Sequence, residues 1–137
     1  MHGQGTLVNH QTNTSYKGNW VNGIREGFGE QTFPTGEIYR GDWKAGAMDG
    51  EGMVLYPNQD RFQGHWENGN RVKGSFLMKN SGIIFKENWI QDTPGGYGQI
   101  EFNSGGRYVG EVKCTPFGKH QIKNFYIFRD GFVCTTK

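Results

Sequence analysis

The sequence predicts an all-β protein, an elongated single-layer antiparallel sheet of stacked β-hairpins. Three observations support this prediction. The four tryptophans follow one another at intervals of 23 residues, apolar and polar residues alternate around them, and the 137 residues include 23 Gly beside 4 Trp, 6 Tyr and 10 Phe. A fixed internal period is typical of repeat proteins, and alternation is typical of strands. Each period therefore predicts one unit of strands and tight turns.

Each unit is expected to contain two strands. In residues 39–46, YRGDWKAG, the alternation places Tyr39, Gly41 and Trp43 on one face and the charged residues on the other. The second strand, residues 50–56, begins with a Gly-x-Gly pair, and residues with turn chemistry separate strands and units. The aromatic residues of the successive first strands are Tyr16, Trp20, Tyr39, Trp43, Phe62, Trp66, Phe85, Trp89 and Tyr108.

These nine aromatic residues are the candidate binding site. A single hairpin cannot bury its apolar face alone, so rings of neighbouring units are expected to pack into one row. The glycine between two rings, and the Gly-x-Gly pair opposite the tryptophan, are expected to leave room for them. In a single-layer sheet, one side of each ring is expected to stay exposed in a groove. Because Trp and Tyr are frequent binding hot spots, this groove is predicted to bind a helix or an extended peptide of a partner protein.

The repeat also resembles a known family. The pattern Y-x-G-x-W-x-x-G-x-x-x-G-x-G, present in residues 39–52, is similar to the MORN repeat, and about five such units cover nearly the whole chain. The resemblance implies a twisted hairpin ribbon that acts as a scaffold, a protein-binding groove or a spacer, with phospholipid binding as an alternative. Residues 66–89 are similar to a segment of small MORN-repeat proteins of cilia and sperm flagella, which implies a cytoplasmic location in the cytoskeleton or the ciliary axoneme.

The repeats divide the chain into a partial N-terminal repeat (1–15), four hairpin repeats (16–107) and a degenerate C-terminal capping repeat (108–137). Residues 1–15 resemble the second half of a repeat. They either form an edge strand that can pair with a neighbour or associate end to end, or they belong to a longer repeat array of which this chain is a piece. The capping repeat either closes the stack or forms a hydrophobic docking end for a partner or a second copy. The candidate docking residues are Phe117, Phe125, Tyr126 and Phe128.

The pattern breaks in three of the units. In the third unit Gly74 replaces the Gly-x-Gly pair, which predicts a bulge or a slipped register. In the fourth unit Glu87 replaces a glycine, and residues 92–95, DTPG, are expected to form the turn. In the last unit Val112 takes the place of tryptophan.

Charge and motifs argue against several other classes of protein. The 15 Lys and Arg and 13 Asp and Glu are interspersed, so nucleic acid is not an expected partner. No apolar run reaches the ~18 residues of a membrane span. Phosphate-loop, zinc-protease and nucleophile-elbow motifs are absent from the sequence, and the four histidines lack metal-ligand spacing. No catalytic residue, metal or cofactor is therefore expected.

Two alternatives to a protein-binding scaffold stay open. Anionic lipid headgroups would need a basic face, and the outward residues Lys17, Arg40 and Lys86 form only a thin basic stripe. The chain could also be a regulatory repeat region of a larger enzyme. The two cysteines, Cys114 and Cys134, form no CxxC motif, and they are predicted to be reduced thiols of an intracellular protein, with one disulfide as the alternative.

Overall fold

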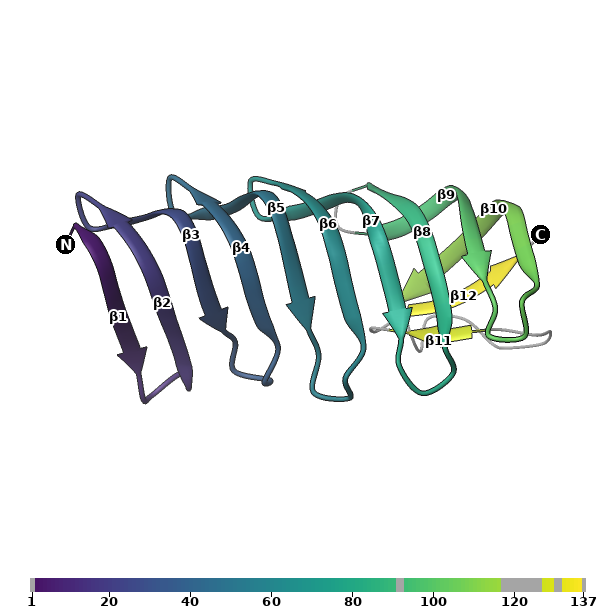
Figure 1. Cartoon of the computed structure of the whole chain (residues 1–137), viewed down its shortest axis with the longest axis horizontal. Coiled ribbons are helices and arrows are strands. Elements are labelled where there is room, and N and C mark those ends of the chain that lie inside the picture. The colour runs from purple at the N-terminus through teal and green to yellow at the C-terminus, as the bar shows by residue number, and fades with distance from the viewer. Residues whose placement is uncertain (1, 91–92, 117–126, 130–131, 137) are drawn as a thin grey trace.

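The residues that the structure describes fold into one antiparallel sheet of twelve strands. The computed structural model describes residues 2–90, 93–116, 127–129 and 132–136. Each strand pairs with its neighbours in sequence up to the tenth, and the order then ends β10-β12-β11. Figure 1 shows the strands side by side along an elongated ribbon, with β1 at one end and β10 to β12 at the other. The predicted all-β stack of hairpins is confirmed.

The strand boundaries follow the repeat. The strands are β1 Gly3–Asn9, β2 Thr14–Val21, β3 Ile24–Thr32, β4 Ile38–Lys44, β5 Ala47–Leu55, β6 Arg61–Glu67, β7 Asn70–Met78, β8 Ile83–Ile90, β9 Thr93–Glu101, β10 Arg107–Pro116, β11 Ile127–Arg129 and β12 Phe132–Thr136. The aromatic first strands are β2, β4, β6, β8 and β10. The turn predicted at residues 92–95 is wrong for its last three residues, because β9 already begins at Thr93.

Two-residue turns join the strands within the first three hairpins. In the turn Ala45-Gly46 both residues have positive φ, 52° and 85°, as the type I′ turn that matches strand twist requires. The Gly46 N–H donates to the Arg25 carbonyl of the preceding hairpin at 3.0 Å, and the Gly69 N–H donates to the Met48 carbonyl at 2.8 Å. The turns therefore also connect consecutive repeats.

A bulge interrupts each of these hairpins beside its tryptophan. In the second hairpin Gly41 pairs with Gly52 and Trp43 pairs with Met48, so Asp42 alone faces the three residues between Met48 and Gly52. The middle one of the three, Gly50, has φ 104°. Bulges bend a strand and increase its twist, so the second strands curve as they leave the turn (Figure 1).

The third hairpin confirms the irregularity predicted around Gly74. There His65 pairs with Lys73 and Trp66 with Arg71, so the bulge holds a single extra residue, Val72. The connection to β8 is one residue longer and compensates for the shorter bulge. Leu77 pairs with Ile84, seven positions further on, whereas the equivalent Leu55 pairs with Arg61, six positions further on. The tryptophan period of 23 is thereby kept.

The core is the row of aromatic rings itself. Tyr16, Tyr39, Phe62 and Phe85 are 0–2 % exposed, and the four tryptophans are 4–8 % exposed. Val112, which takes the tryptophan position of the last repeat, is also buried. The single sheet of the described residues therefore buries the rings of its first strands, because every repeat covers part of the next.

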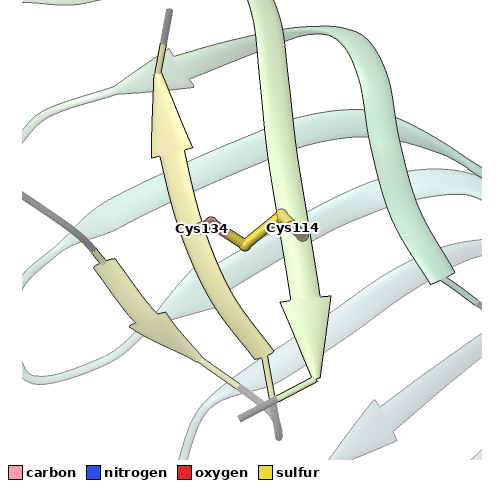
Figure 2. Close-up of a disulfide and its surroundings, with 2 residues drawn as sticks. All are labelled: Cys114 and Cys134. Carbon is pink, nitrogen blue, oxygen red and sulfur yellow. A yellow bond between two sulfur atoms is a disulfide. The ribbon is translucent and has the colours of Figure 1, made fainter. Parts of the chain in front are cut away.

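The two cysteines form a disulfide, so the prediction of reduced thiols is wrong. Cys114 in β10 lies directly opposite Cys134 in β12, and their Cα atoms are 4.1 Å apart. Figure 2 shows the bridge crossing between these two neighbouring strands. Sequence spacing could not reveal the pair, because β12 reaches β10 through a connection without the repeat pattern.

Reducing this disulfide is expected to lower the free energy of unfolding by about 3 kcal/mol, because the bridge closes a sequence separation of 20 residues and restricts the unfolded chain. Urea denaturation with and without a phosphine reductant measures the difference. The Cys114→Ser/Cys134→Ser variant, which should not respond to the reductant, is the control. Equal stability of the wild-type protein in both conditions would contradict the expectation.

Candidate functional site

The aromatic residues of the first strands form a continuous row of edge-to-face contacts. The Tyr39 ring lies 5.4 Å from Trp43 of its own repeat and 5.3 Å from Trp66 of the next, with interplanar angles of 87° and 84°. Tyr16 and Phe62 bridge consecutive tryptophans in the same way. This geometry is the favourable one for aromatic pairs, so the row mechanically couples one hairpin to the next.

The expectation that one side of each ring stays exposed is wrong. Eight of the nine predicted groove residues are buried, and only Tyr108 is partly exposed. Side chains of the second strands lie over the rings: the Arg25 guanidinium is 4.9 Å from the Trp43 ring, and that of Arg71 is 3.7 Å from the Trp89 ring. The rings therefore form the floor of the site, and the side chains above them form its surface.

The glycines of the second strands make room for the tyrosine of their own hairpin, which corrects the expectation that they accommodate the tryptophan opposite. A Cβ on Gly52 would lie 2.3–2.4 Å from atoms of the Tyr39 side chain, and one on Gly29 would lie 2.1–2.6 Å from Tyr16. The Tyr39 side chain lies over Gly52, and its hydroxyl donates to the Asp42 carbonyl at 2.8 Å. The glycine is required because the ring passes directly over it.

The tryptophans use the same glycines in another way. The Trp43 Nε1–H donates to the Gly29 carbonyl, and the Trp66 Nε1–H donates to the Gly52 carbonyl, both at 3.3 Å. Each donor lies one hairpin further along the chain than its acceptor. A buried indole N–H needs such a partner, so Trp43 and Trp66 are each fixed to the preceding repeat.

Burial gives Tyr16 and Tyr39 an alkaline pH dependence, because it raises the pKa of both hydroxyls. Desolvation, with a smaller contribution from the Asp42 carboxylate, raises the pKa of Tyr39 above its usual 10.0. Above about pH 10 the unfolded chain releases this proton while the folded chain keeps it, so stability is expected to fall as the pH rises. Tyr39→Phe is expected to weaken this fall, measured as urea stability between pH 9 and 11 (about the range of tyrosine ionisation). Identical pH slopes for both proteins would contradict the assignment.

Two hollows lie on the aromatic face, above the rings. The first encloses about 600 Å³ and the second about 490 Å³. Their linings share four positions that are separated by one repeat length: Thr14 and Glu37, Arg25 and Met48, Gln31 and Val54, and Gly46 and Gly69. The two hollows are thus the same feature of two consecutive repeats.

The two hollows differ in chemistry. In the first, Arg25 donates from Nη1 to Gln31 Oε1 at 2.8 Å, so a cation and an amide line it. In the second, Met48 and Val54 replace these residues, and Tyr56 lies beside them. Its charged lining residues are Glu37 and Arg71, and the Arg71 Nη1 donates to the Tyr56 hydroxyl at 3.1 Å. A polar hollow is therefore followed by a largely apolar one.

Sequence reasoning missed the residues that make these hollows. The key position is the one opposite each tryptophan, occupied by Arg25, Met48 and Arg71 in the first three hairpins. This position recurs just after each turn, and the recurrence could have identified it from the sequence. It was hidden because the residue type changes from repeat to repeat, whereas the tryptophan does not.

The opposite face of the sheet, which we call the outer face, carries charged side chains together with exposed apolar ones such as Phe28 and Leu55. Lys17, Arg40, Gln63, Lys86 and Val109 are exposed there, as the alternation predicted. Two of the three cations are paired: Arg40 Nη2 lies 2.9 Å from Glu30 Oε2, and Lys86 Nζ lies 3.4 Å from Glu101 Oε2. These pairs reduce the positive charge that the stripe could offer to lipid headgroups.

The predicted docking end is only partly described. Phe117, Phe125 and Tyr126 lie outside the described residues, and Phe128 lies in β11, where only the backbone is described. Among the residues that the structure describes, no three His, Cys, Asp or Glu side chains group as metal ligands. That same part of the chain contains no helix long and apolar enough to cross a membrane.

The fold and the ring row define a hairpin-repeat protein with two hollows above its rings. The family model of the MORN repeat matches residues 16–38, 39–61, 62–80 and 88–107, which is more than half of the chain. The chain therefore belongs to the MORN-repeat family. Its repeats are of a kind that generally mediates interactions with proteins or membranes. Among curated proteins, none matches the chain.

Proposed function

We propose that this protein is a non-enzymatic scaffold that binds another protein through the two hollows of its aromatic face, within a cytoskeletal or ciliary, axonemal assembly of the cytoplasm. The observation that carries the proposal is the recurrence of the same hollow one repeat later, with side chains of different chemistry. A periodic surface favours a periodic ligand, and a protein segment is such a ligand.

The spacing of the hollows favours a particular conformation of that segment. One hairpin advances the sheet by two strand spacings, about 9.5 Å. Seven residues of an α-helix rise about 10.5 Å and return to nearly the same side of the helix. In an extended strand, same-face residues recur at about 6.7 and 13 Å, and neither distance matches. A helix therefore fits, as does a polyproline II segment with its repeat of about 9.3 Å.

The chemistry of the hollows specifies the side chains of the partner. Arg25 in the first hollow can pair with a carboxylate. Met48, Val54 and Tyr56 in the second can enclose an aliphatic or aromatic side chain. The expected partner thus carries an acidic residue and an apolar residue about seven positions apart on one side of a helix.

Placing a carboxylate in a hollow tests the proposal. Met48→Glu is expected to abolish capture of the partner when the tagged chain is purified from its native cells and bound proteins are identified by mass spectrometry. Leu55→Glu, at a position 41 % exposed on the outer face, is the matched control and should leave capture unchanged. Arg25→Glu provides a second test in the first hollow, and thermal melting confirms that each variant folds.

Capture retained by Met48→Glu and Arg25→Glu, but lost in Leu55→Glu, would contradict the proposal and assign binding to the outer face.

The alternative of a peripheral module for anionic phospholipids has a separate test. Flotation with phosphatidylserine vesicles at low and high salt should show no salt-sensitive association if protein binding is the function, because electrostatic lipid binding weakens with salt. A third possibility, a regulatory repeat region of a larger enzyme, would be supported by a catalytic domain in the native polypeptide.

The disulfide bears directly on the proposed location. Disulfides persist mainly in oxidising compartments, so the Cys114–Cys134 bridge of the structure counts against a cytoplasmic or axonemal location, which would require both cysteines to be reduced in cells. Acid quenching of native cells followed by thiol alkylation and mass measurement distinguishes the two states. Two alkylated cysteines are expected for the proposed location, and an intact bridge would argue for an oxidising compartment.

A further inference from the structure

The outer face carries one row of mainly apolar side chains. Direct cross-strand pairs join Ile38 of β4 to Leu55 of β5, Leu55 to Arg61 of β6, Arg61 to Leu77 of β7, and Leu77 to Ile84 of β8. Each of these five residues adjoins in sequence a buried residue of the aromatic face, so alternation turns its side chain to the outer face. We call the five residues the outer row.

Apolar surface on these strands gathers in the outer row. The next row on the same face and strands consists of Arg40, Met53, Gln63, Ser75 and Lys86, and only Met53 among them is apolar. In the outer row, Leu55 is 41 % exposed, and Ile38, Leu77 and Ile84 are each partly exposed. A contiguous apolar surface beside a polar one is typical of an interaction site.

Arg61 gives the outer row a charge at its centre. It is exposed and lies between Leu55 and Leu77. Within the part of the chain that the structure describes, Arg61 forms no ion pair, whereas Arg40 and Lys86 on the neighbouring row are each paired with a glutamate. A ligand that covers the row would remove water from this guanidinium, so it has to bring a carboxylate to the same place.

The spacing of the outer row favours a helical ligand. Neighbouring strands are about 4.8 Å apart, so the five residues extend over about 19 Å. The helix positions i, i+3, i+7, i+10 and i+14 share one side and extend over about 21 Å. In an extended segment, same-face residues recur at about 6.7 Å and miss the strands. Figure 1 shows β4 to β8 side by side at a similar slant, so a straight helix can cross them along the row.

We propose that the outer row binds an amphipathic helix of a second protein, whose contacting side reads apolar, apolar, acidic, apolar, apolar. The helix lies across β4 to β8, with its acidic residue paired to Arg61 and its apolar residues packed on the other four members of the row. This order is the same in both directions along the helix. The site lies on the opposite face from the two hollows, so both faces can be occupied at once.

A designed peptide is the probe. It has about 20 residues, with Leu at the four apolar positions and Glu at the central one of the contacting side, and Ala, Gln and Lys elsewhere. It is acetylated, amidated and labelled, and its binding to the full-length protein is measured by fluorescence anisotropy. The matched control peptide carries Lys in place of the central Glu, with equal helicity checked by circular dichroism. It is expected to bind about fivefold more weakly or less, because repulsion from Arg61 replaces attraction.

Three variants of the full-length protein localise the binding. Arg61→Glu is expected to reverse the preference, so that the Lys peptide binds about fivefold more tightly than the Glu peptide. Leu55→Glu is expected to weaken binding of both peptides by about tenfold, because a carboxylate enters the apolar contact. The matched control is Lys73→Glu, an equal charge reversal at an exposed residue of the outer face that pairs with His65 and Asn88, away from the row. It should bind both peptides as the wild-type protein does.

Several outcomes would overturn the proposal. One is the absence of binding by the Glu peptide, and another is binding that Arg61→Glu and Leu55→Glu leave unchanged in variants with wild-type thermal stability. Binding lost in Met48→Glu and kept in Leu55→Glu would place the helix on the aromatic face instead. A dimer in sedimentation velocity that Leu55→Glu abolishes, while the peptide does not bind, would assign the outer row to a second copy of the chain. None of these results alters the test of the hollows, which follows a different partner on the other face.

Discussion

Replacing Trp43 by alanine is expected to lower the free energy of unfolding by about 3–5 kcal/mol. Its indole is 5 % exposed and contacts Tyr16 and Tyr39 at centroid distances of 5.3 and 5.4 Å. The substitution also removes the donor to the Gly29 carbonyl, which joins two repeats. Urea denaturation followed by circular dichroism measures the change.

The matched control is Tyr97→Ala, which truncates an aromatic side chain that is 75 % exposed and should change stability little. A cost for Trp43→Ala no larger than that of the control would contradict the view that the ring row is the core. The Trp43→Ala/Trp66→Ala variant extends the test to function. If it folds and still captures the partner undiminished, the ring row does not shape the binding face.

Adding one methyl group at Gly52 is expected to destabilise the protein by about 3 kcal/mol, at the upper end for overpacked cores. The new Cβ of Gly52→Ala would lie 2.3–2.4 Å from atoms of the Tyr39 side chain. The Tyr39 ring is completely buried and its hydroxyl is bonded to the Asp42 carbonyl, so it has no free space to enter. Thermal and urea denaturation measure the loss.

Gly106→Ala is the control, because the nearest atoms to its added Cβ lie at 3.9 and 4.0 Å. A double-mutant cycle identifies the cause. Placed in a Tyr39→Leu background, Gly52→Ala should cost much less, since the ring that it meets is gone. Equal costs in both backgrounds would show that the glycine is needed for a reason other than the ring.

Much of this fold could be predicted from the sequence because its determinants are local. The tryptophan period set the repeat length, and alternation around Trp43 set which side chains share a face. Turn chemistry at Gly46 identified the hairpin connection, which the positive φ angles confirm. The single glycine at Gly74 predicted the altered bulge of the third hairpin.

The curvature and its consequences could not be predicted in this way. Alternation assigns a side chain to a face, but it does not state how strongly the sheet bends or what lies over a ring. The burial of Trp43 beneath Arg25 depends on that bend, and so do the two hollows. The Cys114–Cys134 bridge depends on a register between β10 and β12 that no repeat specifies.

The most direct test of the account is nuclear magnetic resonance of the protein with ¹³C-labelled methionine methyl groups, titrated with the captured partner. Met48 lines a hollow on the aromatic face, whereas Met53 lines the opposite face of the same strand. The account predicts that the Met48 methyl resonance shifts or broadens on binding and that the Met53 resonance does not. A shift of Met53 with Met48 unchanged would contradict it and place the partner on the outer face.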